Sequence, residues 1–154
     1  VQTTSGARDV ATQDFFLGPM MTATPPGGCV TRLRFPVWNE PRLGAGFQEI
    51  SARQSDFAYV AAAAQVALDD KGTCTRCAVG VGAATPAPVR LETSALVGTK
   101  LDEATIRAAL AKKIEELDIM IDHHASQAYR RRVALSLASR ALAQARDEAL
   151  GARA

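Results

Sequence analysis

Two apolar runs joined by a polar turn decide the fold: FAYVAAAAQVAL at residues 57–68, DDKG at 69–72 and TCTRCAVGV at 73–81. The first run is rich in alanine, which by intrinsic propensity favours a helix. The DDKG sequence is typical of a hairpin turn, however, and the run after it has the composition of a strand. We therefore expect an antiparallel hairpin, in which small alanine side chains let another layer of structure approach closely.

Helix signals follow the hairpin. Pro86 and Pro88 precede residues 89–97 and Gly98 follows them, which predicts a helix with proline at its start and glycine past its end. Asp102 then stands at an N-cap position, with Glu103 favourably placed in the first turn. The apolar residues after it recur at helical spacing: Ile106, Ala109, Leu110, Ile114 and Leu117.

A last helix is predicted after Ser126, which can serve as its N-cap. Its apolar positions are four residues apart: Tyr129, Val133, Leu137, Ala141 and Ala145. We expect solvent around Arg131, Arg140 and Arg146.

The amino-terminal residues 1–44 are rich in proline, glycine, threonine and aromatic residues. The sequence DFFL at 14–17, before Gly18 and Pro19, predicts a short helical turn that ends at Gly18. A Pro-Gly turn at 25–28 precedes VTRLRF at 30–35, whose alternation predicts a half-buried strand. The expected fold class is α+β: a small antiparallel sheet with about three helices packed on it.

Composition excludes several classes of function. The formal net charge is only +2, which gives little reason to expect nucleic acid or an anionic membrane as a partner. No apolar run approaches the roughly 18 residues that span a bilayer, and no signal peptide is visible. Three cysteines, an odd number, argue against a secreted disulfide framework and favour the cytoplasm. The chain begins at Val1 rather than at methionine, which suggests a processed or truncated product.

Two motifs with metal-ligand residues have simpler explanations. Cys74 and Cys77 have the CxxC spacing of redox and zinc sites, but zinc needs about four ligands and no second pair is suitably spaced. Positions i and i+3 of a strand point to opposite faces, so we expect two ordinary strand cysteines. The sequence DHH at 122–124 supplies too few ligands for a metal and is interpreted as a loop before the last helix.

Other candidate motifs are equally weak. The sequence GVG at 80–82 resembles part of a phosphate-binding loop, but Thr85 and Pro86 follow where a helix should present free amides. The run RRR at 130–132 has no interleaved aromatic residues and predicts a solvated or salt-bridged helix face, not a nucleic-acid site. No serine or histidine has the context of a nucleophile, so we expect neither a catalytic residue nor a metal site in this chain.

Six segments, taken in order, carry motifs of one family. Residues 14–22 are similar to D-F-F-x-G-x-x-x-T, residues 47–58 to F-x-E-x-x-R-R-x-G-D-F-A, and residues 80–90 to G-G-x-x-x-x-P-x-R. Gly98 closes a motif like L-x-G, residues 122–130 match D-x-x-x-S-x-x-Y-R, and residues 140–142 match R-A-L. Over nearly its whole length the chain therefore resembles the medium, flavin-binding subunit of the molybdenum hydroxylases, the family that includes xanthine and carbon monoxide dehydrogenases.

The resemblance implies a place in electron transfer. In that family a large subunit with a molybdopterin cofactor hydroxylates the substrate, and two 2Fe-2S clusters in a small subunit pass electrons to FAD in the medium subunit. Residues 1–42 look like the end of the FAD-binding (PCMH-type) region, and residues 45–154 look like the carboxy-terminal domain. The family's glycine-rich loops, which hold the FAD pyrophosphate, are absent here. The chain is therefore expected to form one wall around a flavin that an amino-terminal FAD-binding portion anchors, and to be inactive alone.

The resemblance also implies cofactor-binding residues. Val30 corresponds to an apolar residue that covers the flavin ring, and Gln48 to a polar residue near the ring edge. Thr22, Cys29 and Asp56 belong to the same loops.

The chain departs from the motifs at three places: Ala52 replaces an arginine, Ser55 replaces a glycine, and an acidic residue is missing around Gly28. Because charges near the ring tune a flavin, these departures are expected to shift its potential. The alternative interpretation is a cofactor-free docking module, whose helices and alanine-rich strand hold partner subunits together.

Overall fold

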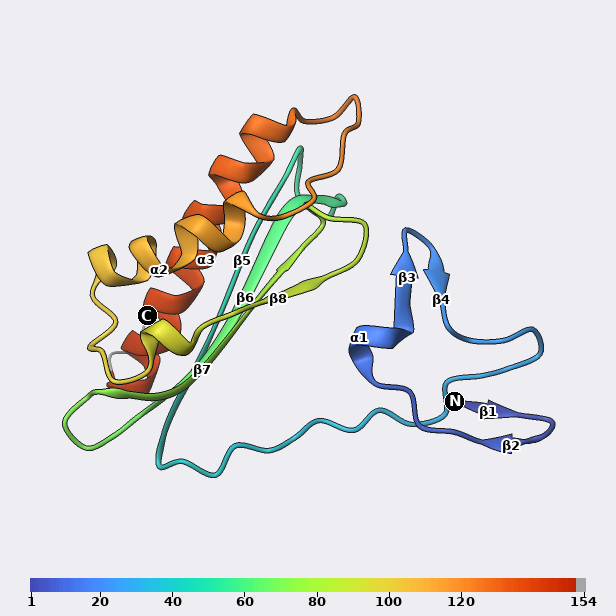
Figure 1. The fold of residues 1–154 in the computed structure, drawn as a ribbon, viewed down its shortest axis with the longest axis horizontal. Coiled ribbons are helices and arrows are strands. Elements are labelled where there is room, and N and C mark those ends of the chain that lie inside the picture. The colour runs from blue at the N-terminus through green and yellow to red at the C-terminus, as the bar shows by residue number, and fades with distance from the viewer. Residues whose placement is uncertain (152–154) are drawn as a thin grey trace. The chain divides into compact units, whose positions relative to one another are not determined.

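The computed structural model describes residues 1–151, and the chain divides after Trp38 into two compact units. We call Val1–Trp38 unit 1 and the residues from Asn39 onward unit 2. The elements of unit 2 (Figure 1) are β5 (Arg42–Ser51), β6 (Ala58–Leu68), β7 (Cys74–Gly82), β8 (Val89–Leu91), the 3-10 helix η1 (Ser94–Leu96), α2 (Glu103–Glu115) and α3 (Gln127–Ala149).

The sheet of unit 2 is an antiparallel meander in the order β5-β6-β7-β8. Its central hairpin, β6 and β7, is the one predicted from the sequence. In the turn between them, Asp69 Oδ1 accepts hydrogen bonds from the amides of Lys71 (2.9 Å) and Thr73 (2.7 Å). Gly72 takes a left-handed φ of +73°, which glycine adopts without steric cost. The turn residues therefore override the helix propensity of the alanines.

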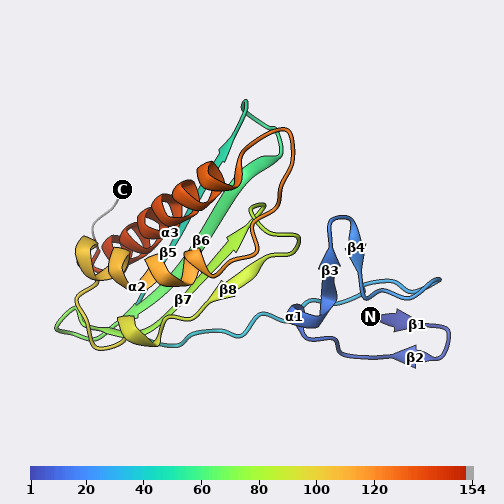
Figure 2. The ribbon, with the colours of Figure 1, turned by 45° about the horizontal axis from the view of Figure 1, so that its top comes forward.

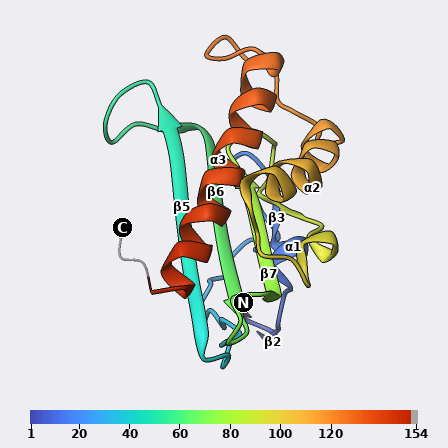
Figure 3. The ribbon, with the colours of Figure 1, turned by 90° about the vertical axis from the view of Figure 1, so that its left-hand side faces the viewer.

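Helices cover one face of this sheet. α3 runs along β5 and β6, and α2 lies beside it on the same face (Figures 2 and 3). The side chains of β6 that face the helices are buried: Val60, Ala62, Ala64, Val66 and Leu68. Phe47 and Ala63, on the opposite face, are exposed. The fold class is α+β, as expected. Within residues 1–151 no helix combines the length and apolarity needed to cross a bilayer.

One tight contact in the core joins backbone to backbone. A Cβ atom added to Gly44 would lie 1.9 Å from the carbonyl oxygen of Ala145, and one added to Gly46 would lie 2.1 Å from that of Ala141. Both alanines are fully buried. The close approach was expected at the alanines of residues 57–68, whereas the contact seen here joins glycines of β5 to alanines of α3, and no sequence motif predicted it.

α3 also covers the free edge of β5. Glu148 Oε2 accepts a hydrogen bond from the backbone amide of Ala45 at 2.7 Å. Gln48 Nε2, further along the strand, donates to Gln144 Oε1 at 2.8 Å. α3 thus contacts β5 in two ways: directly at the backbone of two glycines, and through polar side chains beside them.

Both predicted helix caps are confirmed. Asp102 accepts hydrogen bonds from the Thr105 amide (3.0 Å) and hydroxyl (2.6 Å), which lower the pKa of its carboxyl. Ser126 Oγ accepts from the Tyr129 amide at 3.2 Å. The two predicted apolar stripes face the core, with these members buried: Ile106, Leu110, Ile114, Leu137, Ala141 and Ala145.

The expectation of three solvated arginines on α3 is wrong for two of them. Arg131 is partly buried and donates to the carbonyl of Leu117 at 3.1 Å. Arg146 donates to the carbonyl of Leu101 at 2.7 Å. Only Arg140 of the three is exposed. Carbonyl groups at the ends of the α2 region need donors, and long arginine side chains reach them from the neighbouring helix.

The helix predicted for residues 89–97 does not form. Residues 89–91 instead make the short edge strand β8, in which Val89 pairs with Val81 and Leu91 with Val79. Only the single 3-10 turn η1 follows, where the Glu92 carboxylate accepts from the Ser94 amide at 2.8 Å. Pairing with β7 therefore decides the structure here, against the helix signals of the prolines and the glycine. Gly98 nevertheless adopts a left-handed φ of +85°.

The two cysteines of the CxxC motif lie on the same face of β7, contrary to expectation. The register between β6 and β7 shifts, so that Leu68 pairs with Cys74 but Ala67 pairs with Arg76. Thr75 is the extra residue of this bulge, and it turns both thiols toward the core. Cys74 and Cys77 are buried and free, and the hydrogen bond between their thiols together with burial raises the pKa of Cys74.

Unit 1 is built from short elements: β1 (Gln2–Thr3), β2 (Gly6–Ala7), α1 (Thr12–Phe15), β3 (Phe16–Gly18) and β4 (Met21–Thr22). The predicted helical turn is present, but it ends at Phe15, because the next residues pair with β4 as a hairpin. The half-buried strand predicted at 30–35 is absent. No strand within residues 1–151 pairs with this segment, and Phe35 is 81% exposed.

Unit 1 has no core of its own. None of its residues is buried. Its exposed large apolar side chains are Phe16, Leu17, Met20, Met21, Val30, Leu33, Phe35 and Val37. Two-stranded hairpins without a buried apolar face are at best marginally stable in water. Unit 1 therefore gains little stability from apolar burial.

The close contact between β5 and α3 predicts the effect of one methyl group. Gly46→Ala should lower the free energy of unfolding by about 2–3 kcal/mol, because the added Cβ meets backbone that can yield only by moving the helix. Urea denaturation of this chain measures the change. Gly82→Ala is the matched control, since nothing lies within 4 Å of its Cβ position. Equal stability of the two variants would refute the contact.

Candidate functional site

Three of the five predicted cofactor-binding residues belong to unit 1. Thr22 ends β4 and is exposed, and its Oγ1 accepts from the amide of Thr24 at 3.4 Å. Cys29 forms an antiparallel bridge with Gln2, through backbone hydrogen bonds of 2.8 and 2.9 Å. Val30 follows this bridge with 41% of its surface exposed. The bridge thus fixes the backbone from which the apolar side chain of Val30 projects.

Gln48 lies on the helix-covered side of β5. It is half-buried, and its amide nitrogen donates to Gln144 of α3. Helix and strand therefore fix the orientation of this amide.

Asp56 lies in the β5–β6 loop (residues 52–57), which its side chain organises. One carboxylate oxygen accepts from Arg53 Nε at 3.0 Å and the other from the Phe57 amide at 2.8 Å. Ser55 has a left-handed φ of +60°, which explains why the similar motif has glycine there. The neighbouring Phe57 is 92% exposed and was not among the predicted site residues. The loop therefore carries a carboxylate fixed by the loop itself, followed in sequence by an exposed aromatic ring.

A buried arginine joins three segments at one end of the sheet. Arg130, in the first turn of α3, is only 2% exposed. Its Nη1 donates to the carbonyls of Tyr59 (2.9 Å) and Ala83 (2.7 Å), and its Nη2 donates to Asp122 Oδ2 at 2.6 Å. The predicted salt-bridged helix face is thus half right, because the ion pair exists but its arginine is buried. The motif D-x-x-x-S-x-x-Y-R contains both partners and was the available signal.

Asp122 lies in the α2–α3 loop (residues 116–126), which also carries two histidines. The His123 and His124 rings stand 3.9 Å apart, and His124 stacks on Tyr59 at 6.1 Å. Desolvation opposes the ionised form of Asp122 most strongly. Hydrogen bonds from the amides of His124 and Ala125 and from Arg130 together outweigh it and lower the pKa of the carboxyl. The loop predicted before the last helix is confirmed. Within residues 1–151 no three His, Cys, Asp or Glu side chains cluster as metal ligands would.

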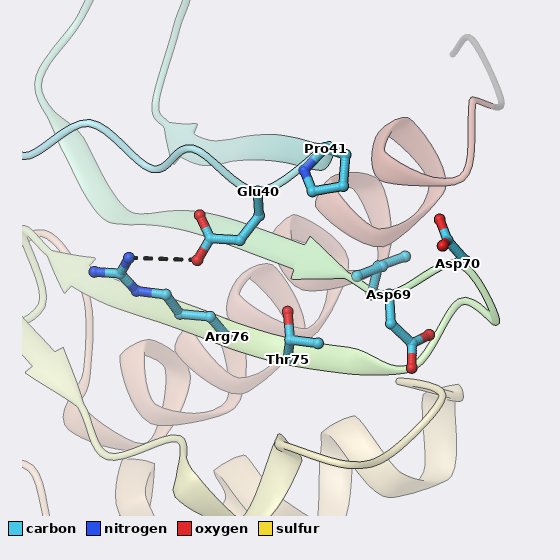
Figure 4. A pocket seen from close by; sticks show the side chains of 7 residues that line it. Glu40, Pro41, Asp69, Asp70, Thr75 and Arg76 are labelled. Atoms are coloured by element: carbon cyan, nitrogen blue, oxygen red, sulfur yellow. Dashed lines mark hydrogen bonds and ion pairs between the residues drawn. The ribbon is translucent and has the colours of Figure 1, made fainter.

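A surface hollow of about 400 Å³ lies elsewhere, between the β6–β7 turn and the residues that lead into β5 (Figure 4). Arg76 reaches across it to Glu40 at 3.5 Å, and Asp69 and Asp70 stand at its rim. None of the five predicted cofactor-binding residues lines it. It therefore adds nothing to the proposed cofactor contacts.

The chain has recognisable relatives. Residues 45–145 match the family of the CO dehydrogenase flavoprotein C-terminal domain. The chain is 29% identical over 150 residues to the 6-hydroxypseudooxynicotine dehydrogenase complex subunit alpha of Paenarthrobacter nicotinovorans, covering 94% of this chain and 49% of the relative. It is 33% identical over 110 residues to the carbon monoxide dehydrogenase medium chain of Afipia carboxidovorans, covering 69% and 37%.

Solved structures agree with these relatives. The crystal structure of a cyanide-inactivated Cu,Mo-CO dehydrogenase superposes with a TM-score of 0.85 at 28% identity, over 94% of this chain and 51% of the other. The chain thus spans about half of that structure and less than half of either relative.

The Asp122–Arg130 ion pair predicts a pH-dependent loss of stability. Asp122→Asn should lower the free energy of unfolding at pH 7, because the buried guanidinium loses its counter-charge. Since the folded-state pKa of Asp122 is depressed, its contribution is complete above about pH 4–5 and disappears as the pH falls through the folded pKa. Urea denaturation of both proteins between pH 7 and pH 2 measures the difference.

Asp70→Asn serves as the control. That carboxylate is 95% exposed, and the substitution removes only an ion pair of 3.8 Å with Arg42. It should leave stability at pH 7 unchanged, because an exposed ion pair contributes little. A difference between wild type and Asp122→Asn that stays constant down to pH 2 would contradict the assignment.

Proposed function

Since the chain belongs to the family of the CO dehydrogenase flavoprotein C-terminal domain, we propose that it is the carboxy-terminal part of the flavin-carrying medium subunit of a molybdenum hydroxylase. In this role it helps to enclose FAD, which accepts electrons from 2Fe-2S clusters after a substrate is hydroxylated at a molybdopterin site. Those groups belong to an iron-sulfur small subunit and a molybdopterin large subunit, its proposed partners. Both relatives are named as subunits or chains of dehydrogenases, which supports an oxidoreductase complex.

The observation that carries the proposal is the uncovered apolar surface of unit 1. Eight large apolar side chains are exposed on 38 residues that bury none. Many large apolar side chains exposed on one short segment favour association with other polypeptide. We infer that residues 1–42 form the end of a FAD-binding region and rest on its remainder, while residues 45–154 form the carboxy-terminal domain. The relatives, which are about twice as long, have room for that remainder.

The described residues suit the ring of a flavin better than its phosphates. Val30 offers an exposed apolar surface, and Asp56 and Phe57 place a polar group next to an aromatic face. In unit 1, Thr22 and Cys29 are proposed flavin contacts beside Val30; in unit 2, Gln48 is proposed as a polar residue near the ring edge. The glycine-rich loops that would hold a pyrophosphate are absent from the sequence. This chain's residues would therefore orient the ring and exclude water from it, and the phosphate contacts would come from the FAD-binding portion.

We also propose a cytoplasmic location. Cys29, Cys74 and Cys77 are all free thiols, and Cys29 is exposed. Free exposed thiols persist in a reducing compartment.

Reconstitution tests the proposal. This chain alone should bind no FAD, whereas the chain joined to the FAD-binding portion of its subunit should acquire a flavin absorption band. The joined subunit should also co-purify with the iron-sulfur and molybdopterin subunits. Tight FAD binding by this chain alone would contradict the assignment of the phosphate contacts. Co-purification without flavin at any stage would favour the cofactor-free docking module instead.

Val30 offers a sharper test of the flavin wall. In the joined subunit, Val30→Asp should weaken FAD binding about tenfold or more, because a carboxylate would be desolvated against the ring. Val37→Asp is the matched control, since Val37 lies in the same unit, is 78% exposed and has no proposed flavin contact. Fluorescence titration with FAD measures both affinities. Equal affinities would remove Val30 from the wall.

A further inference from the structure

We propose that Arg130 is a positioning residue for the flavin wall. It holds the β5–β6 loop and the α2–α3 loop in the arrangement that presents Asp56 and Phe57. The part of this inference that concerns the flavin rests on the proposed function. The part that concerns the loops rests only on the contacts of Arg130.

The first contact fixes the entry into β6. The register between β5 and β6 shifts, so that Ile50 pairs with Val60 but Ser51 pairs with Ala58. Tyr59 is therefore the extra residue of a bulge, and bulged residues leave the ladder of paired backbone groups. Arg130 Nη1 supplies the donor that the Tyr59 carbonyl lacks in the ladder. Because Tyr59 stands two residues after Phe57, this bond anchors the carboxyl end of the β5–β6 loop.

The second and third contacts reach other segments. The same Nη1 donates to the carbonyl of Ala83, which has a left-handed φ of +61° just beyond β7. Nη2 binds Asp122, whose other carboxylate oxygen caps the amides of His124 and Ala125. The His124 ring in turn stacks on Tyr59, the bulged residue itself. Arg130 thus ties the α2–α3 loop to the residue that anchors the β5–β6 loop.

Burying the Arg130 guanidinium costs free energy, which argues that this side chain does more than fill space. A buried guanidinium loses its hydration, and Arg130 Nε finds no acceptor within residues 1–151. A left-handed alanine adds backbone strain. An apolar side chain would avoid the cost of burying the charge but could not bind two carbonyls and a carboxylate. The fork of the guanidinium can bind all three because its donors point in different directions.

Hydrogen exchange tests the positioning directly. Arg130→Lys keeps the charge but not the fork, so exchange of amides at 52–57 and 116–126 should quicken about ten- to a hundredfold. Amides of α2 should stay unchanged. Arg146→Lys is the matched control, because Arg146 donates to Leu101, another left-handed residue, at the opposite end of α3. It should leave both loops unaffected. A uniform increase in exchange across the chain, or no increase in the loops, would overturn the inference.

A flavin measurement separates this inference from the proposed function. In the joined subunit, Arg130→Lys should weaken FAD binding several-fold and shift the flavin absorption maximum, whereas Arg146→Lys should do neither. Loosened loops with unchanged affinity and spectrum would overturn the flavin role of Arg130 and leave the proposed function intact. A wild-type joined subunit that binds no FAD would refute the proposed function itself, whatever the exchange shows.

Discussion

The structure of unit 2 depends on the backbone contact between β5 and α3. Because Gly44 and Gly46 carry no side chain, Ala141 and Ala145 can rest directly on the strand. A helix of 23 residues is thereby seated on a sheet at a fixed distance and direction. Its first turn then reaches the far end of the sheet, where Arg130 meets the carbonyls of Tyr59 and Ala83. A bulkier residue at either glycine would lift the helix and separate these groups.

Local signals sufficed where local chemistry decides the structure. The turn at 69–72, the caps Asp102 and Ser126 and the apolar stripe from Ile106 were all readable from the sequence, because each depends on neighbours within one or two turns. The family resemblance was readable because its motifs recur in order. Local signals failed where distant pairing decided, as at residues 89–91, whose partner β7 overrode the proline signal.

The candidate site was less predictable than the fold. The faces of Cys74 and Cys77 depend on a bulge that no residue pattern announces, since Thr75 is an ordinary strand residue. The burial of Arg130 depends on a bulged carbonyl 71 residues away. Charge and periodicity placed it on a helix face but could not show which acceptors that face meets. The five residues assigned from the resemblance stay predictions; of the two that lie in unit 2, Gln48 is held against α3 and Asp56 organises the β5–β6 loop.

The carboxylate of Glu148 on the Ala45 amide has a consequence for solubility. β5 is the outermost strand of its sheet, and an unprotected outermost strand is a template on which chains of other molecules can polymerise. A β-strand of another molecule could pair with β5 only by displacing this carboxylate. The displaced negative charge would then be buried in an interface without water. Glu148, near the end of α3, thus protects the edge of β5 against pairing with other molecules. Gly44 and Gly46 of this strand have no side chains that could do so.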